Sequence, residues 1–159
     1  MLDLYVDIDA HAAYPHALRA AQRHMLDLYV VTHDFLAPEA NVHLVLAQED
    51  QLNAGTWIGG NISRGDICIT SDAKVASNCV LHGALALTPN GRRWNTGGGG
   101  EADRPNDASL TWPAASRTLA HRLEQAIVTA RSVSSSSTAP PPRFSRLPQL
   151  QPSLRAAIG

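Results

Sequence analysis

The sequence predicts an α/β fold around a mostly parallel sheet of four or five strands, and a repeated hexapeptide is the main reason. Met-Leu-Asp-Leu-Tyr-Val occurs at residues 1–6 and again at 25–30. Each copy holds a short run of strand-forming residues. Pro15 and the apolar spacing up to about Met25 predict a helix between the copies. Since a helix crossover makes the strands it joins parallel, the repeat indicates two neighbouring strands of one sheet.

Further strands and helices follow along the chain. The predicted strands are Leu2–Val6, Leu28–Thr32, Val42–Ala47, Asp66–Thr70 and Leu85–Leu87. The fourth strand is almost continuously apolar, which is typical of a strand buried on both faces of a parallel sheet. The predicted helices cover about residues 15–25, 50–63, 73–82 and 111–131. Glycines weaken the second helix, Gly83 closes the third, and Pro113 suits the first turn of the fourth.

The chain of 159 residues has room for one domain with a substantial core. We predict a domain over residues 1–132 and a disordered tail over 133–159, because the tail is rich in Ser and Pro and poor in apolar residues. No apolar run is long enough to span a membrane, and the start lacks the basic residues of a secretory signal. A cytoplasmic protein is therefore expected. Cys68 and Cys79 stand in apolar settings, which indicates buried thiols rather than ligands.

Acidic side chains are expected to meet at one edge of the sheet. In an open parallel sheet, ligands bind beyond the carboxyl ends of the strands. The residues after the first, second and fourth predicted strands include Asp7 and Asp9, His33 and Asp34, and Ser71 and Asp72. Carboxylates without cysteine suit hard cations such as Mg²⁺ or Mn²⁺. Such an ion can activate water and stabilise the leaving oxygen of a phosphodiester.

Two segments also match the motifs of a protein family. VDIDAH with a helix after it, and then RGDICITSDAKVASNCVLHGALALTPNGR, resemble the YaiI/YqxD family of bacterial PIN-like proteins. The resemblance covers roughly residues 2–94, and more loosely the helix over 111–130. It implies a compact three-layer α/β/α PIN-like fold. By relation to PIN nucleases, it also implies an RNA cut that depends on Mg²⁺ or Mn²⁺.

The chain departs from the family pattern at positions that bear on the site. His11 stands where the family has Cys, and Gly55 and Thr56 stand where it usually has acidic residues on the helix before Trp-Ile. A site with fewer carboxylates is expected to hold its metal more weakly. An alternative therefore stays open, in which a catalytically degenerate domain binds nucleic acid or a protein partner without cleavage. A flavodoxin-like metabolic enzyme is disfavoured, because no phosphate loop or nucleotide motif is present.

The leading hypothesis is a metal-dependent phosphodiesterase that acts on RNA. In it, Asp7 and Asp72 hold the metal, and Asp9 ligates the metal or orients its water. Ser71 and Thr70 support the phosphate. These roles follow from the position of the residues after the first and fourth predicted strands.

Several of these residues have a structural interpretation as well. Asp9 and Asp72 each stand just before a predicted helix, where Asp is a favoured N-cap. His11 is a candidate metal ligand or proton shuttle, but a solvent-exposed loop histidine is the favoured interpretation. His33 and Asp34 are candidates for another edge of the same crevice.

Overall fold

The computed structural model describes residues 1–34, 36–37, 39–47, 53–94 and 112–134. Five strands form a single sheet, in which every pair of neighbours is parallel, in the order β3-β2-β1-β4-β5. The strands are β1 (Leu4–Val6), β2 (Leu28–Thr32), β3 (Val42–Leu46), β4 (Ile67–Ile69) and β5 (Leu85–Leu87). The predicted α/β fold with a parallel sheet is confirmed.

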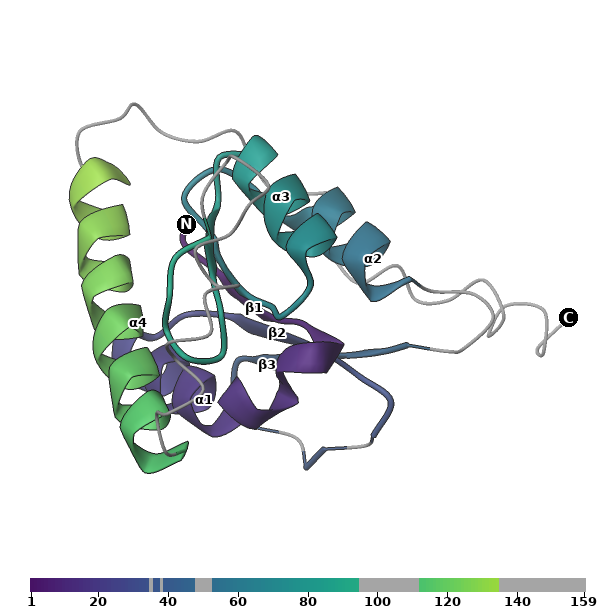
Figure 1. The fold of residues 1–159 in the computed structure, drawn as a ribbon, viewed down its shortest axis with the longest axis horizontal. Helices are drawn as coiled ribbons and strands as arrows, with labels where there is room; N and C mark the ends of the chain where they lie inside the picture. The colour runs from purple at the N-terminus through teal and green to yellow at the C-terminus, as the bar shows by residue number, and fades with distance from the viewer. Residues whose placement is uncertain (35, 38, 48–52, 95–111, 135–159) are drawn as a thin grey trace, which may run out of the picture.

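Helices cover both faces of this sheet (Figure 1). They are the 3-10 helix η1 (Ile8–Ala13) and the α-helices α1 (Tyr14–His24), α2 (Ala54–Asn61), α3 (Ala73–Leu81) and α4 (Trp112–Ser134). The helices α1 and α4 pack on one face, and α2 and α3 pack on the other. The molecule therefore has the predicted three layers. Among the helices that the structure describes, none combines the length and apolar character that a bilayer crossing needs.

The repeated hexapeptide forms the centre of the sheet. Its two copies pair residue for residue, since Leu4 lies opposite Leu28, and Tyr5 opposite Tyr29. The two tyrosine rings stack with centroids 5.1 Å apart. Alternate residues of a strand point to opposite faces. The repeat thus places leucine and valine under α1 and α4, and tyrosine under α2 and α3.

Each face of the sheet has its own core. On the first face, strand side chains pack against small residues of α1 and against Leu119, Leu123 and Ile127 of α4, all fully buried. On the second face, the core includes Cys68 and Cys79, which are buried free thiols as predicted.

The observed elements differ from the predicted ones mainly at their ends. Strand β1 lacks two predicted residues at its start, because the Asp3 N–H donates to the Asp66 carboxylate instead of to a backbone carbonyl. Strands β3 and β4 are likewise shorter than predicted. Helix α2 begins only after Asn53, whose side chain caps it; its predicted first residues, 50–52, lie outside the described part of the chain. Helix α3 ends at Leu81, with His82 as its C-cap, and Gly83 follows with a φ of +78°.

The prediction missed the 3-10 helix η1, which lies between β1 and α1. Asp7 is its N-cap, and Ala10 has non-helical angles inside it. Helix α1 then ends at His24, and its C-cap, Met25, has the left-handed conformation.

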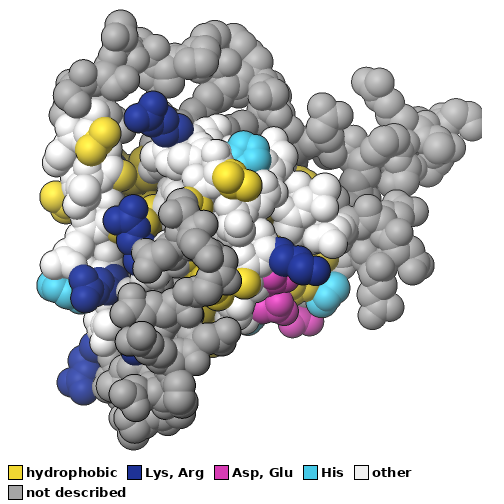
Figure 2. Space-filling model, turned by 45° about the horizontal axis from the view of Figure 1, so that its top comes forward, with side chains coloured by type: hydrophobic (Ala, Val, Ile, Leu, Met, Phe, Trp, Pro, Cys, Tyr) yellow, Lys and Arg dark blue, Asp and Glu magenta, His cyan; other side chains and the backbone are white. Residues whose placement is uncertain are grey.

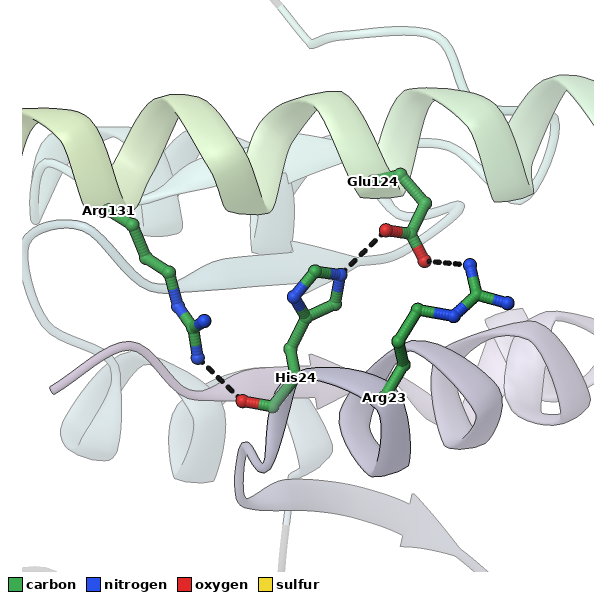
Figure 3. A network of polar contacts seen from close by, with 4 residues as sticks. All are labelled: Arg23, His24, Glu124 and Arg131. Carbon is green, nitrogen blue, oxygen red and sulfur yellow. Dashed lines mark hydrogen bonds and ion pairs between the residues drawn. The ribbon is translucent and has the colours of Figure 1, made fainter.

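Helix α4 is tied to α1 by a polar network as well as by apolar packing (Figure 3). Glu124 accepts hydrogen bonds from Arg23, at 3.0 Å, and from His24, at 2.6 Å. Arg131 donates to the carbonyl oxygen of His24. This helix runs to Ser134, slightly past the predicted domain boundary at residue 132. The remainder of the predicted tail lies outside the described residues.

Candidate functional site

The three predicted aspartates line one cavity at the carboxyl edge of the sheet. The cavity has a volume of about 380 Å³. The described part of its lining contains no Lys or Arg, and its polar residues are Asp7, Asp9, His33, Asn53 and Asp72. Figure 2 shows acidic side chains gathered in a patch beside basic and histidine side chains. The described lining of the cavity, with three aspartates and no Lys or Arg, is acidic.

The pleat of the strands decides which side chains reach this cavity. Alternate residues share a face, so Asp7 follows the side of Tyr5, and His33 follows the side of Tyr29. Both tyrosines belong to the core beneath α2 and α3. The cavity thus opens on that side of the sheet, where the N-terminal caps of both helices line it as well.

Among the described carboxylates that line the cavity, Asp7 is the most buried, with an exposed fraction of 1%. Its Oδ1 accepts a hydrogen bond from the N–H of Ile8 at 2.8 Å. Its Oδ2 accepts one from the hydroxyl of Thr70 at 2.7 Å. Each carboxylate oxygen has further lone pairs, so these two bonds fix the side chain without using all its acceptor capacity.

The surroundings of Asp7 disfavour its charged form. Burial raises the pKa of Asp7 above the ordinary value of 3.8, and the neighbouring charges of Asp9 and Asp72 raise it further. The hydrogen bonds from Thr70 and Ile8 act in the opposite direction but do not cancel the rise. The charges of Asp9 and Asp72 therefore act on the buried carboxyl group of Asp7.

Thr70 links the two strands that deliver these aspartates. Its hydroxyl donates to Asp7 and accepts from the N–H of Asp72 at 3.0 Å. Its carbonyl accepts from the indole Nε1 of Trp94 at 3.1 Å. Thr70 is fully buried and is not among the described residues that line the cavity. Its direct contact with phosphate stays a prediction. The hydrogen bonds by which Thr70 joins Asp7 and Asp72 were not predicted.

The structural interpretations of Asp72 and Asp9 fare differently. Asp72 does cap a helix, since its Oδ1 accepts from the N–H of Lys74 at 2.7 Å, and it also lines the cavity. For Asp9 the capping interpretation is wrong. Asp9 lies inside η1 and is exposed, because the chain turns into a 3-10 helix directly after Asp7, which takes the cap position.

Two other predicted site residues stand outside the described lining. Ser71 is exposed, and its hydroxyl donates to the carbonyl of Asp9 at 3.5 Å. His11 is exposed as expected, but it lies on η1 rather than in a loop, and its ring stacks on Tyr14. Their proposed contacts with phosphate and metal remain predictions.

His33 lines the cavity, while Asp34 beside it does not. Nδ1 of His33 lies 2.8 Å from the carbonyl oxygen of Ala47, the first residue after β3. The sequence indicated His33 through its place after β2. Its orientation depends on Ala47, which is fourteen residues away.

Helix α2 contributes backbone and an amide to the cavity, but no carboxylate. Asn53 Oδ1 accepts from the N–H groups of Gly55 and Thr56. A Cβ at position 55 would lie 2.7 Å from Cγ2 of Val75. The packing of α2 against α3 therefore leaves no space for an acidic side chain at position 55.

The donors of the cavity fit a hard divalent cation by their chemical type. Among the described residues, no group of three or more His, Cys, Asp or Glu side chains can hold a metal ion by itself. Mg²⁺, however, is usually held by one or two carboxylates, with waters and substrate phosphates completing its octahedron. Asp7 and Asp72 supply such carboxylates.

The fold and site define an α/β protein with a five-stranded parallel sheet and an acidic cavity at its carboxyl edge. The chain belongs to the YaiI/YqxD family, described as uncharacterised, whose model matches residues 5–98. The predicted resemblance is confirmed.

The curated relatives are bacterial UPF0178 proteins. The chain is 34% identical to one from Azorhizobium caulinodans over 57% of its own length and 58% of the relative's. It is 35% identical to one from Rhodospirillum centenum, over 59% and 62%. It is 40% identical to one from Ruegeria pomeroyi, over 57% and 60%. The match thus spans about three fifths of these relatives. No solved structure matches the chain.

Proposed function

We propose that the protein is a nuclease that cleaves RNA with the help of Mg²⁺ or Mn²⁺ bound at the acidic cavity. The observation that supports this most directly is the placement of Asp7, Asp9 and Asp72 in the lining of one cavity. RNA is the proposed substrate because the family resembles PIN-like proteins, which relates it to the PIN nucleases.

The electrostatics of the cavity favour a cation. Asp7 is buried next to two other carboxylates, and its pKa is raised as a result. No Lys or Arg in the described lining balances these charges. A divalent ion would do so, and when bound it would polarise a phosphoryl oxygen and lower the pKa of a bound water.

The protein's own residues have distinct tasks in this proposal. Asp7 and Asp72 hold the ion, and the Thr70 hydroxyl keeps their two segments together. Asp9, which is exposed, orients water from the open side of the cavity. The N-terminal ends of α2 and α3 border the cavity, and such ends favour phosphate groups.

Calorimetric titration with Mn²⁺ and cleavage of a fluorescently labelled single-stranded RNA test the proposal. The wild type should bind Mn²⁺ and cut the RNA. Asp7→Asn and Asp72→Asn should each lower metal affinity and cleavage by roughly 100-fold, at least as much as loss of a supporting residue around a metal. Asp34→Asn is the matched control, because Asp34 stands at the same edge but not in the described lining. Unchanged cleavage by Asp7→Asn would contradict the proposal.

A second candidate function is RNA binding without cleavage. It is favoured by Gly55, where the close approach of Val75 leaves no room for the acidic side chain of the family pattern. This candidate expects a shift of labelled RNA in a native gel with no shortened product, with or without Mn²⁺. Shortened product that disappears in EDTA would rule it out in favour of the nuclease.

A further inference from the structure

We propose that His33 is a further catalytic residue of the acidic cavity, where its Nε2 accepts a proton from the water that attacks the phosphodiester. This inference rests on the proposed nuclease function and adds a proton acceptor to it. His33 lines the same cavity as Asp7, Asp9 and Asp72.

The hydrogen bond to Ala47 fixes which ring nitrogen is free. Nδ1 of His33 lies 2.8 Å from a backbone carbonyl oxygen. A carbonyl oxygen can only accept, so Nδ1 must carry a proton. In the neutral ring, Nε2 is then left with its lone pair. The partner of one nitrogen thus sets the role of the other, as it does for histidines in metal and catalytic sites.

The strand order places His33 beside the aspartates. β2 lies next to β1, and β4 lies on the other side of β1. His33 follows β2 and Asp7 follows β1, so Asp7 stands between His33 and the segment that carries Asp72. Neighbouring strands are about 4.8 Å apart. A phosphate held near Asp7 would therefore lie within reach of the imidazole.

The surroundings of His33 suit a proton acceptor rather than a structural role. The residue is exposed, so water reaches the ring. Among the described residues of the same lining, the charged groups are the carboxylates of Asp7, Asp9 and Asp72, and Asn53, the N-cap of α2, contributes a neutral amide. Within the described part of the chain, the ring makes one hydrogen bond, to Ala47.

The step balances with water as the only co-reactant. The water oxygen forms a bond to phosphorus while one of its protons moves to Nε2 of His33. The bond between phosphorus and the leaving sugar oxygen breaks, and that oxygen takes a proton from solvent. His33 then returns its proton to water. A positioned general base of this kind typically accelerates a reaction by about 10²- to 10⁴-fold.

Two substitutions of His33 test the roles of its two ring nitrogens separately. His33→Asn keeps an amide N–H where Nδ1 donates to Ala47 but removes Nε2. His33→Gln reaches the place of Nε2 with an amide that does not take up a proton. Both should lower kcat for labelled RNA by about 100-fold or more, with KM and Mn²⁺ affinity changed by less than threefold. His82→Asn is the matched control, since His82 also places Nδ1 2.8 Å from a backbone carbonyl but lies outside the described lining.

Nitrogen NMR of the histidine rings gives a readout that does not need activity. In the free wild type, His33 should show a protonated Nδ1 and a bare Nε2. A protonated Nε2 in the neutral ring would overturn the inference. Cleavage by the wild type that His33→Asn retains would overturn the role of His33 and leave the nuclease standing. No cleavage by the wild type with either metal would overturn both.

Discussion

Asp66 and Asp7 are buried at opposite ends of the sheet, and their side chains are held in different ways. Asp66 precedes β4 at the amino end and is fully buried; its two oxygens accept from the backbone N–H groups of Asp3, at 3.1 Å, and Ser63, at 2.8 Å. Asp7 follows β1 at the carboxyl end. Its carboxylate is held by one backbone N–H and one hydroxyl, and it lines a cavity with two other carboxylates.

The difference teaches how to separate a structural aspartate from a candidate functional one. A buried carboxylate whose oxygens meet backbone N–H groups joins segments of the fold. A buried carboxylate that faces other carboxylates in a cavity carries unfavourable electrostatics, which a protein retains for function more often than for stability. Burial alone does not tell Asp66 and Asp7 apart. Of the four predictions that follow, three test this comparison and one tests the packing around the cavity.

Asp66→Asn should have the largest effect on stability. An asparagine can accept a hydrogen bond from only one of the two N–H groups, because its NH2 group, which is a donor, would face the other. Leaving a buried donor without its charged acceptor costs roughly 3 kcal/mol. Urea unfolding followed by tryptophan fluorescence measures this loss, with an unchanged slope against urea. Asp34→Asn, an exposed change, should stay within about 0.5 kcal/mol of the wild type. A similarly small loss for Asp66→Asn would show that the fold does not need this carboxylate.

Gly55→Ala should have the next largest effect, and it probes the packing around the cavity. An alanine inside a helix normally stabilises it by about 1 kcal/mol relative to glycine. Here the new Cβ would lie 2.7 Å from Cγ2 of Val75. Overpacking of this kind costs about 1–3 kcal/mol, so we expect a net loss of about 1 kcal/mol.

A double-mutant cycle isolates that contact. Val75→Ala removes Cγ2, and in its background Gly55→Ala should no longer destabilise the protein. The coupling free energy between the two positions should then be about 1 kcal/mol or more. If Gly55→Ala destabilises equally in both backgrounds, the contact with Val75 is not the reason that this helix carries a glycine, and an acidic side chain would fit there.

The sequence predicted the scaffold better than the site. The strands and their parallel direction followed from short-range patterns, and the rule on carboxyl ends predicted that Asp7, Asp9 and Asp72 lie at one edge; the order of the strands in the sheet was not predicted. The bridge through Thr70 and the hydrogen bond from His33 to Ala47 depend on pairs of residues that only the fold brings together. Asp66 was predicted only as the first residue of the fourth strand, because nothing in the local sequence shows that its carboxylate accepts from the N–H of Asp3, sixty-three residues away.

Asp7→Asn should change stability in a way that depends on pH. The folded-state pKa of Asp7 is raised above its ordinary value of 3.8. Between those two values the native protein binds more protons than the unfolded chain, so wild-type stability falls as pH rises through this range. Asparagine does not titrate. The melting temperature of Asp7→Asn relative to wild type should therefore increase from pH 4 to pH 7. The matching change in free energy is about 1.4 kcal/mol for each pH unit that separates the folded and unfolded pKa values of Asp7.

EDTA must be present in that comparison, because a bound cation would stabilise the charged carboxylate. A flat difference for Asp7→Asn would mean that the surroundings favour neither form of Asp7, and one that falls with pH would mean that they favour the carboxylate. Either result would contradict the unfavourable electrostatics assigned to Asp7.

Glu124→Gln should have the smallest effect on the free energy of unfolding, although it weakens the contacts among three side chains at the amino end of the sheet. Glu124 joins Arg23 and His24, but the Arg23 side chain is 68% exposed and Glu124 is 32% exposed. Exposed ion pairs contribute about 0.2–1 kcal/mol and weaken with salt, so we expect a loss of about 0.5 kcal/mol that shrinks in 1 M NaCl. The loss for Asp66→Asn should not shrink, because salt does not reach a buried group. Glu124→Gln could instead lower the free energy of unfolding as much as Asp66→Asn does, with no dependence on salt. Solvent screening would then not determine the strength of polar contacts at this end of the sheet, and burial would not explain why Asp66 matters more.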